Sequence, residues 1–116
     1  VKTEKSYKNA FDLFTNAFNL GEKEAIVNIG LCHLQGNGTK ENKKEAVKCF
    51  KIAANKYKSS LGYYNLGICY ENGFGIRQDY KKAIEMYGKS VELGEKTGLE
   101  AIKRVYSKMN INDYRV

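Results

Sequence analysis

The sequence contains no proline and no long run of apolar residues. Because proline interrupts helices, its absence is typical of a chain that is nearly all helix and short turns. No segment approaches the roughly twenty consecutive apolar residues that a membrane-spanning helix requires, and no signal-type segment precedes the first predicted helix. We therefore expect no membrane span. The chain begins at Val1 and not at a methionine, from which we expect it to belong to a longer protein.

Reactive side chains are also scarce. His33 is the only histidine, and no orienting acid or nucleophile forms a recognisable set with it, so general-base catalysis is not indicated. The chain has no Cys-x-x-Cys pair and no second histidine from which a zinc site could be built. Its two Gly-x-Gly segments lack the further residues of a phosphate-binding loop. We predict no catalytic residue, no metal site and no cofactor, and therefore no enzyme.

Acidic residues are outnumbered, 13 against 20 basic residues, which gives a net charge of +7. A basic surface can bind nucleic acid, a membrane surface or an acidic peptide, whereas exposed lysines on a helix often serve only solubility. Aromatic residues suited to base stacking are missing from the polar face of the most basic segment, residues 40–58. Nucleic-acid binding there is a disfavoured alternative. The lysines of this segment are Lys40, Lys43, Lys44, Lys48, Lys51, Lys56 and Lys58.

What the sequence does contain is an internal repeat with a period of about thirty-seven residues. The segment NIGLCHLQGNGTKENKKEA, residues 28–46, returns as NLGICYENGFGIRQDYKKA, residues 65–83. A unit of this length is one supersecondary element that can bury its apolar face only against its neighbours. We therefore predict a stack of helical hairpins whose function lies on a surface and not in a pocket.

Apolar residues at helical spacing predict six helices joined by short turns. The Gly-x-Gly segments at 36–38 and 73–75 turn the chain, because glycine reaches positive φ without strain. Asn42 and Asp79 are predicted N-caps, the former in a capping box with Glu45. The predicted helices span residues 6–20, 24–35, 43–56, 63–71, 80–93 and 100–109.

The three cysteines cannot all pair. Cys32 and Cys69 hold the same position in the two copies of the repeat, and such positions lie one helix-pair spacing apart, beyond the roughly 7 Å that a disulfide allows between Cα atoms. We predict that Cys32, Cys49 and Cys69 are buried, reduced thiols that fill the core. This favours an intracellular, cytoplasmic location.

The repeated residues resemble the Sel1-like repeat family, a relative of the tetratricopeptide repeat in which two helices are joined by a Gly-x-Gly loop. The first copy departs from the family pattern at His33, Thr39, Asn42 and Glu45. The last copy matches least and carries Val105-Tyr106 at the Leu-Gly position, which suggests a terminal unit. The second copy supplies the pattern most completely, with Gly62, Leu66, Gly67, Tyr70, Gly73, Gly75, Ile76, Asp79, Lys82, Ala83 and Tyr87.

The resemblance implies an all-α, right-handed α-solenoid whose first helices line a concave face, as in scaffolds and adaptors. We expect one repeat domain over residues 1–116. Within it, residues 1–21 form the second helix of an incomplete repeat, residues 22–58 and 59–94 form two repeats, and residues 95–116 form the first helix of a terminal partial repeat.

The predicted binding residues lie on the first helices, on the side away from the core. Asparagine amides can hold a peptide backbone, an aromatic ring can anchor it, and a Lys-Arg pair can bind a carboxylate. This arrangement resembles the carboxylate-clamping groove of some tetratricopeptide domains. The alternative is that Asn28 and Asn65 only satisfy neighbouring backbone groups or stabilise the stacking of the repeats. The predicted residues are Asn28, Leu31, Gln35, Tyr64, Asn65, Ile68, Asn72, Lys103 and Arg104.

The sequence thus predicts a non-catalytic interaction module that binds a protein or peptide segment, with an acidic or carboxylate group, on the concave face. One alternative is a regulatory or accessory module of a larger signalling enzyme. Another is self-association through the solenoid ends, where Phe11 and Phe18 are expected to be exposed. Phe74, at the tip of the second loop, is either a loop anchor or an exposed contact.

Overall fold

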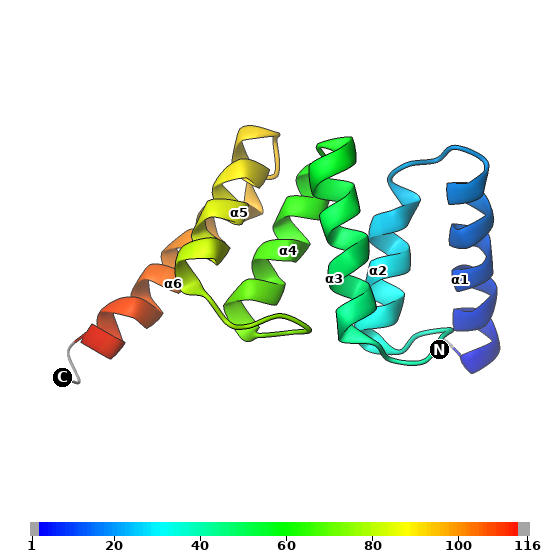
Figure 1. The fold of residues 1–116 in the computed structure, drawn as a ribbon, viewed down its shortest axis with the longest axis horizontal. Coiled ribbons are helices and arrows are strands. Elements are labelled where there is room, and N and C mark those ends of the chain that lie inside the picture. Colours follow the sequence, from blue (N-terminus) through cyan, green and yellow to red (C-terminus); the bar gives the residue numbers. More distant parts are fainter. Residues whose placement is uncertain (1–2, 114–116) are drawn as a thin grey trace.

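The helices of the chain follow one another in sequence order along its longest dimension (Figure 1). In this computed structural model, which describes residues 3–113 and their side chains as far as residue 110, every regular element is a helix. The prediction of an all-helical chain is therefore confirmed. The elements are α1 (Glu4–Asn19), α2 (Ala25–Gln35), α3 (Lys43–Lys51), the π-helix η1 (Ile52–Lys56), α4 (Ser60–Asn72), α5 (Tyr80–Glu92) and α6 (Thr97–Asp113).

The N-caps of α3 and α5 are those that the sequence predicts. Asn42 Oδ1 accepts the Glu45 backbone N–H at 3.0 Å, and Asp79 Oδ1 accepts that of Lys82 at 3.0 Å. The capping box expected at Asn42 is wrong in its second half. The Asn42 backbone N–H donates to the His33 carbonyl oxygen at 2.7 Å, so it cannot also bond the Glu45 side chain.

The second glycine of each Gly-x-Gly loop ties the loop to the preceding helices. Gly38 and Gly75 have φ of 76° and 69°, and a side chain at either would collide with a backbone carbonyl, that of Tyr7 and that of Lys43 respectively. Phe74, between the glycines of the second loop, is half-buried against the core, with Lys43 Nζ 5.1 Å from its ring centroid. Of the two roles open for Phe74, the structure shows the loop anchor.

Each helix pair is held by an aromatic ring that packs directly on a glycine. A Cβ atom placed on Gly30 of α2 would lie 2.6 Å from Phe50 Cε1, and one placed on Gly67 of α4 would lie 2.7 Å from Tyr87 Cε1. Both rings are fully buried. Glycine therefore allows the two helices of each pair to approach closely at this point.

The predicted helix over residues 43–56 is regular only in its first part. Its last turn is the π-helix η1, with Ala53 and Ala54 buried, and Lys58 follows with a φ of 53°. Ala17 precedes Ala53 by thirty-six residues, whereas Ala25 precedes Gly62 by thirty-seven. The stretch from Ala53 to Gly62 therefore holds one residue more than the stretch from Ala17 to Ala25, and a π turn accommodates it without breaking the helix.

The expectation that Phe11 and Phe18 are exposed is wrong. The Phe11 ring lies edge-on to His33 at 5.6 Å between centroids, and Phe18 packs on Tyr57 at 6.4 Å. Both rings face the helices that follow α1. The exposed large apolar side chains are instead Leu13 of α1, at 66% exposure, and Leu20, the C-cap residue of α1, at 87%.

Candidate functional site

Three of the predicted binding residues meet in one groove between α1 and α2. Asn28, Leu31 and Gln35 come from successive turns of α2, so helical periodicity places them on one side of it. The groove has a volume of about 170 Å³. It is lined by Tyr7, Ala10, Phe14, Asn28, Leu31, Cys32, Gln35 and Asn37.

The predicted residues of α4 have mixed surroundings. Asn65 is only 8% exposed, and its Nδ2 donates to the Leu61 carbonyl oxygen at 2.9 Å. Asn72 is exposed, and its Nδ2 donates to the Ile68 carbonyl oxygen at 3.0 Å. Tyr64 and Ile68 are half-buried against the cluster formed by α5 and α6. The α4 positions that remain open to a partner are therefore Tyr64, Ile68 and Asn72.

The two predicted cations on α6 differ. Lys103 is 75% exposed, and its Nζ lies 3.5 Å from Glu100. Arg104 instead faces α4, where its Nε and Nη2 donate to Glu71 at 2.8 and 2.6 Å. The guanidinium thus already has a carboxylate partner within the chain, and the function proposed below does not depend on it.

Sequence reasoning did not find Glu71, the best-connected buried group of the structure. Its side chain is 1% exposed. It accepts a hydrogen bond from the Tyr87 hydroxyl at 2.7 Å and one from Lys108 Nζ at 2.7 Å, besides the two from Arg104. This network, which we call the Glu71 cluster, joins α4, α5 and α6 and satisfies both oxygens of the buried carboxylate.

The electrostatics of the Glu71 cluster follow from its geometry. Burial alone raises the pKa of the Glu71 carboxyl, but the hydrogen bonds from Arg104, Lys108 and Tyr87 outweigh burial and lower this pKa to about 2. Burial, followed by the bond to Glu71, raises the pKa of Tyr87 above its ordinary value. The cluster therefore holds a charged carboxylate and a protonated phenol at neutral pH.

A signal for this cluster is visible once the two copies are aligned. Glu71 stands where the first copy has Leu34, and Tyr87 stands where it has Phe50. Both changes replace an apolar side chain that lies in the core or packs against it by a polar one. Paired exchanges of this kind indicate that the two residues meet, because a lone buried polar group would be unsatisfied.

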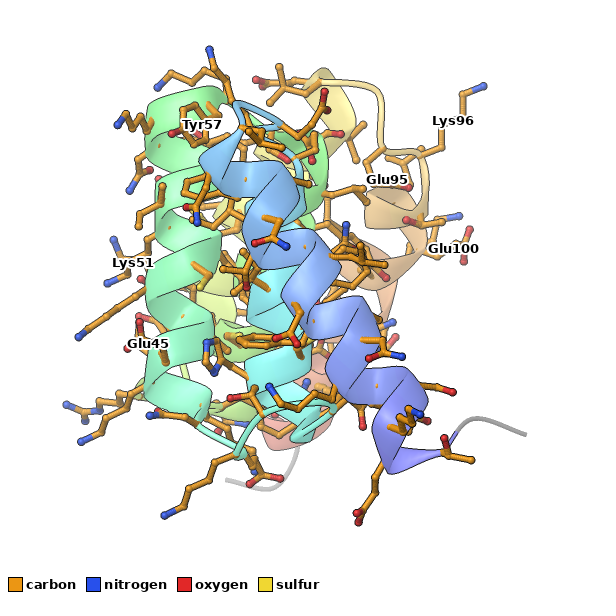
Figure 2. All side chains as sticks on the ribbon, turned by 90° about the vertical axis from the view of Figure 1, so that its right-hand side faces the viewer. Glu45, Lys51, Tyr57, Glu95, Lys96 and Glu100 are labelled. Carbon is orange, nitrogen blue, oxygen red and sulfur yellow. The ribbon has the colours of Figure 1, made fainter. Side chains whose placement is uncertain are left out.

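The lysine-rich segment, residues 40–58, runs from the loop before α3 through α3 and η1. All seven of its lysines are exposed. Figure 2 shows Glu45 and Lys51 of α3 on one side of the molecule and Glu100 of α6 on the opposite side. Nζ–carboxylate distances of 3.8 Å join Lys43 to Glu41 and Lys48 to Glu45.

The cysteines are buried and unpaired, as predicted. Burial raises the pKa of each of them, to about 11 for Cys49 and about 12 for Cys69. The thiols therefore remain protonated at neutral pH. Within residues 3–113, no group of three or more His, Cys, Asp and Glu side chains is placed to hold a metal ion, and no helix has the length and apolar character needed to cross a membrane.

Helix pairs that are each closed by a glycine–ring contact and that stack in sequence order define a helical-repeat solenoid. Two segments, residues 23–57 and 60–95, match the family model of the Sel1 repeat, and each contains one helix pair. Together they cover more than half of the chain. The chain belongs to the Sel1 repeat family, which confirms the resemblance seen in the sequence. Sel1 repeats are generally protein–protein interaction modules.

Solved structures support the same conclusion. The crystal structure of a Sel1 repeat protein from Oxalobacter formigenes is 30% identical over 86% of this chain, with a TM-score of 0.77. That of a protective antigen present in uropathogenic Escherichia coli strains, which displays an SLR fold, is 32% identical over 88%, with a TM-score of 0.77. This chain spans 39% and 22% of the lengths of these proteins. No curated protein matches it.

Proposed function

We propose that the chain binds a segment of another protein along the face formed by α2, α4 and α6, which we call the first-helix face. The observation that carries the proposal is the α1–α2 groove, where Asn28, Leu31 and Gln35 meet the apolar side chains of Ala10 and Phe14. A groove with apolar walls and a few amide groups fits a polypeptide, since the amides can bond its backbone.

In this proposal the bound partner segment continues from the groove across α4, where Tyr64, Ile68 and Asn72 offer apolar area and one exposed amide. Lys103 of α6 lies beyond them and can pair with an acidic group of the partner. The chain contributes binding and no catalysis in this proposal. Asn65 acts by supporting α4, because its side chain is buried and bonded to its own helix.

Site-specific photo-crosslinking tests the proposal. We expect a photoreactive residue at Gln35 or Asn72 to crosslink a partner protein in cells, and one at Lys44 or Lys51 to give no such product. The partner, identified by mass spectrometry and purified, is expected to bind more weakly to Gln35→Ala and unchanged to Lys44→Ala. Crosslinks from the lysines alone would contradict the proposal.

The outcome in which only the lysines crosslink would favour the basic face of α3, the alternative noted from the sequence. The seven exposed lysines are the observation behind that alternative. Binding through this basic face would have an affinity that falls steeply with added salt, because each phosphate or carboxylate contact releases counterions. Binding in the α1–α2 groove is expected to change little between 50 and about 200 mM salt, since the groove is largely apolar.

A further inference from the structure

A second cavity, which we call the junction pocket, lies between the beginning of α4 and the end of α5. It has a volume of about 210 Å³. Figure 1 shows the end of α5 and the end of η1, which continues α3, at one edge of the molecule, opposite the two Gly-x-Gly loops. None of the pocket residues is among those assigned to the first-helix face. They are Lys58, Tyr63, Lys89, Glu92 and Leu93.

Tyr63 brings an unused hydrogen-bond donor to the junction pocket. The residue is only 6% exposed, and its hydroxyl bonds no residue in the part of the chain that the structure describes. A largely buried hydroxyl without a partner costs stability. The first copy of the repeat avoids this cost, because it has Ile26 at the same position. The Tyr63 hydroxyl is therefore free to donate to a ligand in the pocket.

Lys58 holds a backbone conformation that glycine holds at the other two junctions between helix pairs. It follows the C-cap residue of η1, as Gly21 and Gly94 follow those of α1 and α5. Its φ is 53°, and no other non-glycine residue of the described chain has a positive φ. A side chain strains the backbone in this region, whereas glycine does not. The lysine therefore costs stability, and strained residues of this kind cluster at functional sites.

Lys89 places a second cation at the junction pocket. Its Nζ lies 5.6 Å from the centroid of the Tyr63 ring. Its ion pair with Glu85, at 3.8 Å, joins two side chains that are about half exposed and is therefore weak. Lys58 has no acidic partner among the described residues. Both ammonium groups can thus turn to an anion in the pocket, whereas the first copy has the uncharged Ile52 at the position of Lys89.

We propose that the junction pocket binds the carboxylate of an acidic side chain of another protein. Lys58 and Lys89 pair with the carboxylate, and the Tyr63 hydroxyl donates a hydrogen bond to it. The methylene groups of the bound side chain lie on Leu93, which is 47% exposed. The pocket adds a contact outside the first-helix face, and its existence does not depend on the function proposed for that face.

The charge and the size of the pocket both favour this ligand. Glu92 also lines the pocket, so its two lysines and one glutamate leave a net charge of +1. This charge balances a carboxylate and falls short of the nearly double charge of a phosphate group. Drug-sized ligands occupy pockets of about 300–1,000 Å³. The junction pocket, at about 210 Å³, is smaller and suits a single glutamate side chain.

A pair of blocked tripeptides tests the site by nuclear magnetic resonance. Acetyl-Ala-Glu-Ala-amide is expected to shift the backbone amide signals of Lys58, Tyr63 and Gly94 saturably. We expect a Kd of about 1–10 mM, because the probe makes only one charge-assisted contact. Acetyl-Ala-Gln-Ala-amide has nearly the same shape without the charge, and it is expected to give no saturable shift.

Two variants of the chain separate binding from stability. Lys58→Gly is expected to weaken binding of the glutamate probe at least about fivefold. It should not lower the thermal midpoint, because glycine is unstrained at this φ. Tyr63→Phe removes only the unused hydroxyl and is expected to weaken binding at least about threefold, with no loss of stability. Lys44→Ala, which changes an exposed lysine outside the pocket, is the matched control and is expected to bind normally.

Three results would overturn the proposal: no saturable shift with the glutamate probe, equal binding of the glutamine probe, or unchanged binding by Lys58→Gly. Tighter binding of inorganic phosphate than of the glutamate probe would also overturn it, since the ligand would then be a phosphate group. Binding of glutarate without binding of the tripeptide would contradict it as well, because the ligand would then be a small free acid. The first-helix face is judged separately, by crosslinking at Gln35 and Asn72.

Discussion

The two complete helix pairs share one backbone contact but differ in the chemistry around it. In α2–α3 and in α4–α5, a glycine of the first helix lies directly on an aromatic ring of the second, at nearly the same separation. In the first pair the ring is Phe50, and it packs in a hydrophobic cluster without a charged side chain. In the second pair the ring is Tyr87, whose hydroxyl bonds the buried Glu71.

The comparison shows that the close helix approach and the nature of the core beside it are set independently. Glycine determines how near the helices come, while the residue four positions later determines how the next helix is held. Leu34 needs only apolar neighbours, whereas Glu71 needs the donors that Tyr87, Arg104 and Lys108 supply. The Glu71 cluster therefore fixes α6 by directional bonds as well as by packing.

The largest effect is expected from disrupting the glycine–ring contact that both helix pairs share. Gly67→Leu should lower the free energy of unfolding by more than about 3 kcal/mol, because the new side chain cannot fit against the Tyr87 ring. Urea denaturation followed by circular dichroism measures this. Gly88→Leu, where no atom lies within 4 Å of the added Cβ, is the control. Equal loss in both variants would show that the glycine contact is not the cause.

Lowering the pH should reduce the stability that Glu71 contributes in the second pair. The first pair has Leu34 at this position and lacks that contribution. The pKa of Glu71 is about 2 in the folded chain against an ordinary 4.5, so its contribution is complete above about pH 4.5 and is lost as the pH falls towards 2. The contribution amounts to about 3 kcal/mol. The difference in unfolding free energy between the unmodified chain and Glu71→Gln should therefore shrink over this range. Parallel pH curves would contradict the assignment.

Replacing Glu71 and Tyr87 by the apolar residues that the first pair has at these positions tests whether the two polar residues are energetically coupled. Glu71→Leu should cost about 2 kcal/mol, since it leaves the buried Tyr87 hydroxyl without its acceptor. Tyr87→Phe should cost about 1 kcal/mol, since Glu71 loses that bond but keeps those from Arg104 and Lys108. The double variant has the Leu34–Phe50 combination and should cost at least about 1 kcal/mol less than the sum of the two. Additive losses in a thermodynamic cycle from chemical denaturation would show that the residues are not coupled.

The smallest effect on stability is expected at the outer surfaces of α3 and α5, the second helix of each pair. Gly88 of α5 lies in open space, where α3 has Lys51. Gly88→Ala should raise the free energy of unfolding by about 0.5–1 kcal/mol, because alanine is a better helix former than glycine. A thermal melt measures the gain. Lower stability would indicate that the α5 backbone needs glycine there for a reason that the packing does not show.

The local features of the fold could be predicted from the sequence. The caps at Asn42 and Asp79 and the two Gly-x-Gly turns depend on residues within a few positions of each other, so their signals are local. The predicted second helix, residues 24–35, differs from α2 by a single residue. The last predicted helix was too short at both ends, because α6 begins at Thr97 and extends to Asp113 without a strong cap signal.

The candidate site was only partly predictable. Helical spacing correctly brought Asn28, Leu31 and Gln35 to one side of α2. It could not show that Arg104 turns towards Glu71, since thirty-three residues separate them and the contact depends on how α6 crosses α4. Nor could it separate Asn65 from Asn28, which have the same local pattern and differ only in whether another helix covers them.

The sequence by itself determined that this protein is a row of helix pairs, because apolar spacing, glycine turns and capping residues act over a few positions and recur in register. Only the tertiary structure decided which of the equivalent positions are covered and which are open. Burial depends on neighbours that are distant in the chain, so Phe14 and Tyr87 hold the same place in the repeat and yet have different surroundings. The α1–α2 groove and the Glu71 cluster both depend on which distant parts of the chain pack together.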